Sequence, residues 1–507
     1  MLGGGAQAGE RPANDRRATG ERPASEGKLR LPPVAADASL DAMSQSASAS
    51  PGNIEMLRPV NPATGQVVGQ VAVATLADVA AAVARAHRAL AGWRSLAPAA
   101  RAAALAAAGA EVQAAAPALA DLVTAEMGKL RRAALAEAQS VAESLKSLHH
   151  LLPALEPVEH RDGKLVTQVV RDPLGVVAAI TPWNFPLSMP ESLISPALLA
   201  GNTVVWKPSE LTPLTGALLH ERIAAALPPG VLDLVQGADG TGRALVAADV
   251  QMVAFVGSQA VGKSIMQAAG SDLKRLVLEL GGKDPMVVLE DADLDRAAEF
   301  AVNGSFRNSG QVCVSIERIF VHEAVADAFI EKVVARAKSW RVGPGPSEEA
   351  DMGPMASATQ RDRVLAQLED ARRRGAQVLL GGHAMPGPGF FLEPAVVVGV
   401  SGDMALMREE TFGPVAAIER VKSADEAIAK ANATSFGLGA TLWCGAPDRA
   451  RVLAARLDAG MVGVNRSIGG VSGTPWVGAK QSGFGFIESP EGLRQFTQTR
   501  KISYEEP

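Results

Sequence analysis

Cysteine is scarce in this sequence, which contains two in 507 residues. Cys313 and Cys444 lie far apart in the chain, so they offer no disulfide framework of the kind that stabilises small secreted domains. So few thiols suit a reducing compartment, and we expect a cytoplasmic protein. A lone cysteine is more often a small buried hydrophobic residue than a nucleophile, so a catalytic role requires partners from elsewhere in the sequence.

Long apolar runs and a strong net charge are also missing. No stretch approaches about 18 uninterrupted apolar residues, so we expect no membrane span. The formal net charge is -5, from 49 basic and 54 acidic residues, which gives the chain no electrostatic basis for binding nucleic acid. The arginine triplet at 372–374 is interpreted as a solvated helix end. No metal ion is expected either.

The first fifty residues differ in composition from the rest. They are rich in Ala, Gly, Pro and Ser, and the pentapeptide GERPA occurs at 9–13 and again at 20–24. Such a segment buries too little apolar area to offset the entropy of ordering, which predicts a disordered tail over 1–56. It has neither the apolar core of a secretory signal nor the acid-poor composition of a transit peptide. An upstream extension before a start at Met43 or Met56 is the alternative.

The remaining chain has the pattern of an α/β protein of two or three domains. Turn residues and alternating apolar positions predict a hairpin over 61–74, and helical periodicity fills 77–150, with Pro98 and Pro117 as expected helix boundaries. After 173, short β-branched runs alternate with helical stretches, which indicates βαβ units and a parallel sheet. The expected strands are 176–180, 203–206, 231–235, 253–256, 275–280 and 286–289.

Polar or glycine-rich segments follow several of these strands, at the sheet edge where parallel sheets bind ligands. Asn184 follows the first strand between two aromatic residues; it suits a turn, and its amide also suits an oxyanion hole. KPSE at 207–210 and a glycine-rich turn at 257–262 follow the next strands, and such a turn can face a phosphate. Glu279 lies inside an apolar strand, where a carboxylate is costly unless paired or protonated. Each feature alone suits a structural role, and together they indicate a site.

These segments, in this order, resemble the aldehyde dehydrogenase superfamily, of the NAD(P)-dependent, hydrolytic, non-acylating type. The resemblance covers roughly 57–507, and its motifs are WNFP (183–186), KPSE (207–210), FVGSQAVG (255–262), ELGGKDP (279–285), GQVC (310–313), EETFGPV (409–415) and PWVGAKQSGFG (475–485). It implies that Cys313 is the nucleophile that forms a thiohemiacetal and then a thioester. Asn184 is implied as the oxyanion donor, and Glu279 as the general base that activates water. Cys444 matches no motif and is expected to be structural.

The resemblance also implies a cofactor, NAD with NADP possible, and an aldehyde as the small-molecule substrate. By motif, Lys207 and Glu210 contact the adenine ribose, Gly257 and Ser258 lie beside the pyrophosphate, Glu410 and Phe412 contact the nicotinamide ribose, and Ile180 and Trp183 line the same cleft.

The implied architecture is a Rossmann-like cofactor domain (57–154 and 174–281), an α/β catalytic domain (282–482) and a β oligomerisation arm (155–173 and 483–507). The alternating patterns of 166–173 and 497–505 suit strands that pair with another subunit, so a homodimer or homotetramer is expected.

The substrate pocket is expected to be largely apolar. Its candidate residues are Phe185, Met189, Glu191, Val312, Val314 and Trp476. Glu191 and Ser192 lie where succinate-semialdehyde relatives carry an arginine for the substrate carboxylate, although Arg466 could restore a positive contact. We therefore expect a medium-sized aliphatic or aromatic aldehyde.

Four alternatives remain open. A succinate-semialdehyde dehydrogenase would use Arg466, and a CoA-acylating relative typically lacks a base at the position of Glu279. A non-catalytic protein on the same fold would not need Cys313, Asn184 and Glu279 together. A Cys–His thiol hydrolase would need a histidine motif, and none of the seven histidines lies in one.

Overall fold

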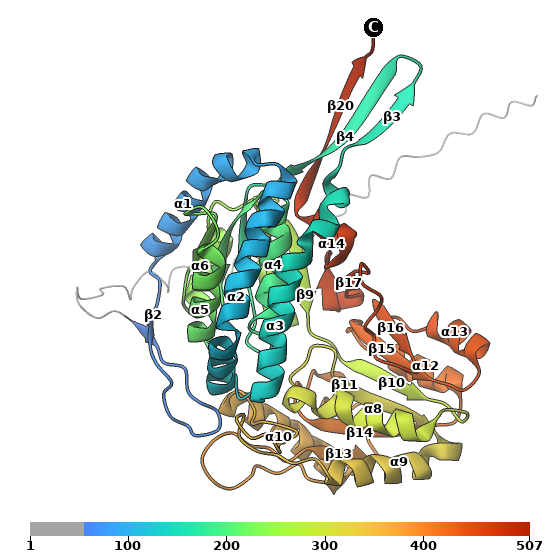
Figure 1. The fold of residues 1–507 in the computed structure, drawn as a ribbon. Helices are drawn as coiled ribbons and strands as arrows, with labels where there is room; N and C mark the ends of the chain where they lie inside the picture. The colour runs from blue at the N-terminus through green and yellow to red at the C-terminus, as the bar shows by residue number, and fades with distance from the viewer. Residues whose placement is uncertain (1–54) are drawn as a thin grey trace, which may run out of the picture. The chain divides into compact units, whose positions relative to one another are not determined.

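The computed structural model describes residues 55–507, and two large sheets flanked by helices account for most of them (Figure 1). The expected tail at 1–56 lies almost entirely outside the described residues. The hairpin expected over 61–74 begins earlier and is smaller, because the two-residue strands β1 (Met56–Leu57) and β2 (Val71–Ala72) pair around a long loop.

The first sheet contains the strands predicted between 176 and 280. In sheet order they are β18 (Gly483–Phe484), β9 (Arg275–Leu280), β8 (Met252–Gly257), β5 (Val176–Ile180), β6 (Thr203–Lys207) and β7 (Leu232–Leu234). All are parallel except β18, which pairs antiparallel with β9. β5, β6 and β8 are buried almost throughout, as expected for β-branched runs covered on both faces.

Helices that precede β5 in the chain, and helices that connect the strands from β5 to β9, pack on this sheet. They are α1 (Leu76–Ser95), α2 (Pro98–Met127), α3 (Arg131–Ser147), η1 (Leu148–Leu155), α4 (Ser188–Leu199), α5 (Pro213–Ala224), α6 (Asp239–Ala247) and α7 (Gln259–Gly270). The boundary predicted at Pro98 is confirmed, since α2 begins there. The boundary predicted at Pro117 is wrong, because α2 continues through it. Small apolar side chains of α2 pack along α3, and this burial offsets the one backbone bond that a proline removes.

Within residues 55–507, α2 is the one helix long and apolar enough to cross a membrane by length and composition. Its position is that of a core helix. Arg101 and Glu126 on α2 are buried, and the Arg101 guanidinium donates to the Leu199 carbonyl at 2.9 Å. The Glu126 carboxylate accepts from the first backbone N–H groups of α5. The prediction of no membrane-spanning run is compatible with this packing.

The second sheet forms the rest of the fold. In sheet order its strands are β12 (Gln377–Leu380), β13 (Ala395–Val398), β14 (Val415–Val421), β11 (Ile316–His322), β10 (Asp284–Val288), β15 (Gly439–Trp443) and β16 (Met461–Val464), all parallel except β12. Its helices are α8 (Leu294–Phe306), η2 (Arg307–Gly310), α9 (Glu323–Lys338), α10 (Ala358–Arg373), α11 (Ala405–Arg408), α12 (Ala424–Asn432) and α13 (Pro447–Ala454). A three-residue turn at 281–283 joins β9 of the first sheet directly to β10 of the second.

The segments predicted as an arm form a three-stranded antiparallel ribbon. Its order is β20 (Thr497–Glu505), β4 (Leu165–Pro173), β3 (Val158–Asp162), and β3 and β20 are largely exposed (Figure 1). Not all of the range 483–507 belongs to this ribbon. β18 lies in the first sheet, β17 (Trp476–Val477) pairs with β19 (Phe486–Ile487), and η3 (Lys480–Ser482) and α14 (Ser489–Gln495) flank them.

Candidate active site

The three predicted catalytic residues line one cavity of about 160 Å³. Glu279 lies on β9 of the first sheet, and Cys313 lies in the turn that precedes β11 of the second. Asn184 comes from the turn between β5 and α4. Since β9 and β10 are joined by a three-residue turn, the two sheets bring a thiol, a carboxyl group and an amide to the same space.

A network of amide groups holds the turn that carries Cys313. Asn184 Nδ2 donates to the Gln311 carbonyl at 3.1 Å, and Asn308 Nδ2 donates to the carbonyls of Asn184 and Gln311 at 3.2 Å. Asn308 and Ser309 have positive φ angles of 54° and 59°, which non-glycine residues seldom adopt. Asn184 has a second N–H besides the one bound to Gln311, and this donor suits an oxyanion formed at Cys313.

The pKa of the Glu279 carboxyl group is close to neutral pH. Its side chain is buried, with the residue 5% exposed, and burial raises its pKa to about 7. Trp476 Nε1 donates to Glu279 Oε1 at 3.0 Å, a bond that lowers the pKa but does not cancel the effect of burial. A carboxyl group with a pKa near the working pH is suited to general base catalysis.

The pKa of the Cys313 thiol is also raised by the site. Its removal from bulk water raises its pKa well above the usual range, and the carboxyl groups of Glu279, Asp284 and Glu410 raise it further. The thiol is therefore protonated at neutral pH. Attack on a carbonyl therefore requires that the thiol first lose this proton.

Groups suited to a dinucleotide lie on the cavity wall and, outside the cavity, at the end of β6. Gly257 ends β8, and Ser258 is the N-cap of α7, so free backbone N–H groups and the positive end of the helix dipole face the cavity. Lys207 ends β6, two strands from β8, which is about 10 Å at the usual strand spacing. Lys207 Nζ lies 3.5 Å from Glu210 Oε2, and the Glu210 side chain is 47% exposed, so its carboxylate is free to accept bonds from ribose hydroxyls. These groups fit an adenosine and a pyrophosphate.

The remaining cofactor candidates divide into two groups. Trp183, Glu410 and Phe412 line the cavity with Cys313, and the Trp183 and Phe412 rings meet edge to face at 5.6 Å. Ile180 does not line it, because its side chain packs into the buried core of the first sheet. Two lining residues, Gln360 and Arg363, were not predicted. Both lie on α10, whose sequence carries no local motif that indicates a site.

A larger cavity of about 950 Å³ adjoins the catalytic one, with Met189 lining both. Of the other predicted pocket residues, Glu191 and Trp476 line the larger cavity. Phe185, Val312 and Val314 are not among the residues that line either cavity, and their role in the substrate pocket stays a prediction. The Phe185 ring packs under the Lys129 ammonium at 3.9 Å, and Val312 is buried in the protein.

The charge of the larger cavity is acidic. It is lined by Glu143, Glu191 and Glu488, and no lysine or arginine, Arg466 included, is among its lining residues. Glu191 accepts from the hydroxyls of Ser144 at 2.9 Å and Ser195 at 2.7 Å, and burial raises its pKa to about 7.

No group of three or more His, Cys, Asp or Glu side chains suited to a metal ion occurs in the part of the chain that the structure describes. Cys444 lies outside both cavities, buried, with its thiol near Asp291 Oδ2 at 3.6 Å.

Comparison with known proteins agrees with this geometry. The model of the aldehyde dehydrogenase family matches residues 49–502. A succinate-semialdehyde dehydrogenase [NADP(+)] 1 of Mycobacterium bovis is 37% identical over 449 residues, which are 87% of this chain and 98% of that protein. A betaine aldehyde dehydrogenase of Cereibacter sphaeroides is 36% identical over 446 residues, 87% of this chain and 92% of that protein. The crystal structure of an NAD-dependent aldehyde dehydrogenase from Sinorhizobium meliloti superposes with a TM-score of 0.86 at 35% identity, covering 89% of this chain and 91% of that one.

Proposed function

We propose a route and a substrate class for this chain, which belongs to the aldehyde dehydrogenase family and is an NAD(P)-dependent oxidoreductase. The route is hydrolytic oxidation of an aldehyde to its carboxylic acid through a thioester on Cys313. The observation that carries it is the placement of Cys313 and a buried Glu279, with a pKa of about 7, in one cavity.

The steps follow from the groups in that cavity. Cys313 Sγ loses its proton to solvent water and bonds to the carbonyl carbon, and the carbonyl π electrons become an oxyanion that Asn184 Nδ2 and the Cys313 backbone N–H stabilise. NAD or NADP, when bound, supplies the acceptor for the hydride that leaves this carbon. The carbonyl re-forms as a thioester. Glu279 then takes a proton from water, the water oxygen bonds to the thioester carbon, and the C–S bond breaks to release acid and thiolate.

A CoA-acylating route would pass the acyl group to a second thiol and would need no base at Glu279. The Trp476 bond to Glu279 and the buried position of this carboxyl group favour the hydrolytic route. A Cys–His hydrolase is disfavoured because none of the residues that line the catalytic cavity is a histidine.

The acidic lining of the larger cavity favours aldehydes without a carboxylate. Above pH 7 Glu191 is ionised, and an anionic substrate would meet like charge near the catalytic cavity. Two relatives are named above. Betaine aldehyde carries a positive charge, which this acidic lining tolerates, whereas succinate semialdehyde carries a carboxylate, which it would repel.

We therefore expect neutral aldehydes to be used with a higher kcat/KM than succinate semialdehyde. Replacing Glu191 with Gln removes the charge and keeps the shape, and Glu191→Arg reverses it, so both should improve use of succinate semialdehyde, by roughly tenfold for about 1.4 kcal/mol of relieved repulsion. Glu221→Gln, on the surface of α5, is the matched control. Succinate semialdehyde as the best wild-type substrate would overturn this assignment.

Cofactor preference follows from Glu210. We expect NAD to be preferred and NADP tolerated, because a 2′-phosphate near this carboxylate would meet like charge. The repulsion is up to ~4 kcal/mol for two unit charges about 4 Å apart at an effective dielectric of about 20, and less here because Glu210 is half exposed. Lys207 offsets part of it. Steady-state kinetics with both cofactors test this, and a kcat/KM for NADP equal to or above that for NAD would contradict it.

We also propose that the protein is a cytoplasmic homodimer or homotetramer. The outer edges of β3 and β20 are unpaired within residues 55–507 and suit strand pairing with another subunit. Both cysteines are free, which suits a reducing compartment. Light scattering gives the molar mass, and a monomer at micromolar concentration would refute the assembly. Cell fractionation tests the location.

A further inference from the structure

We infer that Lys283 and Glu317, an ion pair outside the catalytic cavity, position the loop that holds the reactive end of the cofactor. This inference rests on the proposed function and adds two positioning residues to it. Glu317 is on β11 of the second sheet, and Lys283 is the last residue of the turn that leads into β10 of the same sheet. Neither residue lines the catalytic cavity.

The Glu317 carboxylate is a three-way acceptor for the loop. Its Oε2 accepts from the Thr411 backbone N–H at 2.8 Å, and its Oε1 accepts from the Phe412 backbone N–H at 2.8 Å. Lys283 Nζ donates to Oε2 at 2.6 Å. The side chains are 3% and 0% exposed, so water does not compete for these bonds. A carboxylate that receives two backbone N–H groups fixes the position of the peptide between them.

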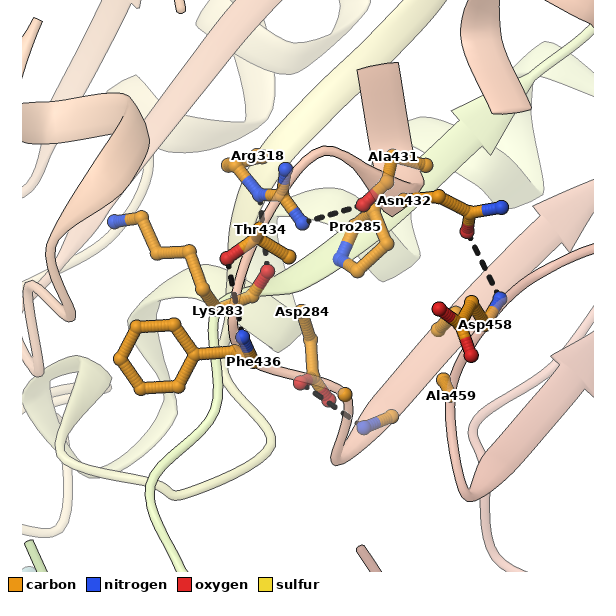
Figure 2. Close-up of a pocket in the computed structure, with 13 residues that line it drawn as sticks. Lys283, Asp284, Pro285, Arg318, Ala431, Asn432, Thr434, Phe436, Asp458 and Ala459 are labelled. Carbon is orange, nitrogen blue, oxygen red and sulfur yellow. Dashed lines mark hydrogen bonds between the residues drawn. The ribbon is translucent and has the colours of Figure 1, made fainter. Parts of the chain in front are cut away.

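Lys283 is itself held from two sides. Its Nζ also donates to Thr411 Oγ1 at 2.9 Å, which ties the ammonium to the same loop. Its backbone carbonyl accepts from Arg318 Nε at 3.0 Å. In Figure 2 the Lys283 side chain points away from the small cavity that Asp284 and Arg318 line. The three side-chain atoms Glu317 Oε1, Glu317 Oε2 and Lys283 Nζ therefore bind residues 411 and 412, and the Lys283 carbonyl ties the start of β10 to Arg318.

The loop needs this support because its backbone is strained. Phe412 has a φ of 49°, which an aromatic residue adopts only when its surroundings impose it. Gln360 Nε2 holds the opposite side of the loop by donating to the carbonyls of Thr411 and Phe412, both at 3.0 Å. Glu317 thus binds the N–H groups and Gln360 the carbonyls. Loss of either set would let Phe412 relax.

The ion pair should act on one part of the cofactor and not on the other. Glu410 and Phe412 line the cavity that contains Cys313, and the hydride acceptor must reach that cavity. Lys207 and Glu210 lie at the end of β6 in the other sheet and do not line it. The Lys283–Glu317 pair should therefore affect the part of the dinucleotide that enters the catalytic cavity and leave the adenosine part unaffected.

Equilibrium binding of NAD and of ADP to purified protein separates these parts. Glu317→Gln should raise the Kd for NAD at least tenfold and change the Kd for ADP less than twofold. The double variant Lys283→Met with Glu317→Gln removes both charges, so it leaves no unpaired buried charge, and it should fold and show the same split. Glu419→Gln, which breaks the partly buried ion pair between Glu419 on neighbouring β14 and Lys430, should bind both ligands as the wild type does.

The outcomes are distinct. Variants that fold, judged by thermal unfolding, and bind NAD and ADP as the wild type does would overturn the inference. Equal weakening of NAD and ADP would mean that the pair supports the fold only, and would also overturn it. A wild-type protein that binds ADP and NAD but oxidises no aldehyde would refute the proposed function while leaving the positioning role intact.

Discussion

Cys313→Ala is expected to abolish NADH formation with every aldehyde, a loss of at least about 10⁴-fold, while NAD still binds. Without a sulfur nucleophile no tetrahedral adduct forms, so no hydride is released from the aldehyde carbon. Absorbance at 340 nm measures the loss, and cofactor binding shows that the site is intact. Cys444→Ala is the matched control because this thiol is buried near Asp291 and lies outside both cavities. Activity that survives in Cys313→Ala but not in Cys444→Ala would mean that the wrong thiol has been assigned.

Glu279→Gln is expected to fail in a different way. The amide keeps the size of the side chain but cannot take a proton from water, so the thioester on Cys313 should form and then persist. One equivalent of NADH per site should appear in a fast phase, followed by turnover slowed by about 10²- to 10⁴-fold. Stopped-flow absorbance resolves the two phases. Absence of the burst, with normal NAD binding, would mean that Glu279 also accepts the proton of the Cys313 thiol, whose pKa the site raises.

The assignment of Glu279 as the general base also predicts how the rate of thioester hydrolysis depends on pH. Burial raises the pKa of Glu279 to about 7, so its basic form increases as the pH rises through 7. Hydrolysis of the thioester should accelerate over that range in the wild type and lose this dependence in Glu279→Gln.

The sequence predicted the first sheet closely because its strands are buried on both faces. The run 176–180 is apolar and mostly β-branched, the run 275–280 is largely apolar around Glu279, and the observed strands have the same bounds. Helix boundaries were less predictable. Pro98 begins α2, whereas Pro117 lies within it, because contacts along α3 that no local pattern reports outweigh the local effect of a proline.

The site was predictable where motifs follow parallel strands and not elsewhere. Asn184, Glu279 and Cys313 were predicted from motifs that resemble those of a known family, and the structure places all three on one cavity. Gln360 and Arg363 come from a helix without a motif, and Glu317 is recognisable only once its bonds to residues 411 and 412 are seen.

The most direct test of the division of labour between Cys313 and Glu279 is the intact mass of Glu279→Gln protein after mixing with saturating aldehyde and NAD. We predict one adduct per chain with the mass of the acyl group, located on the peptide that contains Cys313 and absent from Cys313→Ala. Steady wild-type turnover without an adduct would remove Glu279 from the mechanism and support transfer of the acyl group to another thiol.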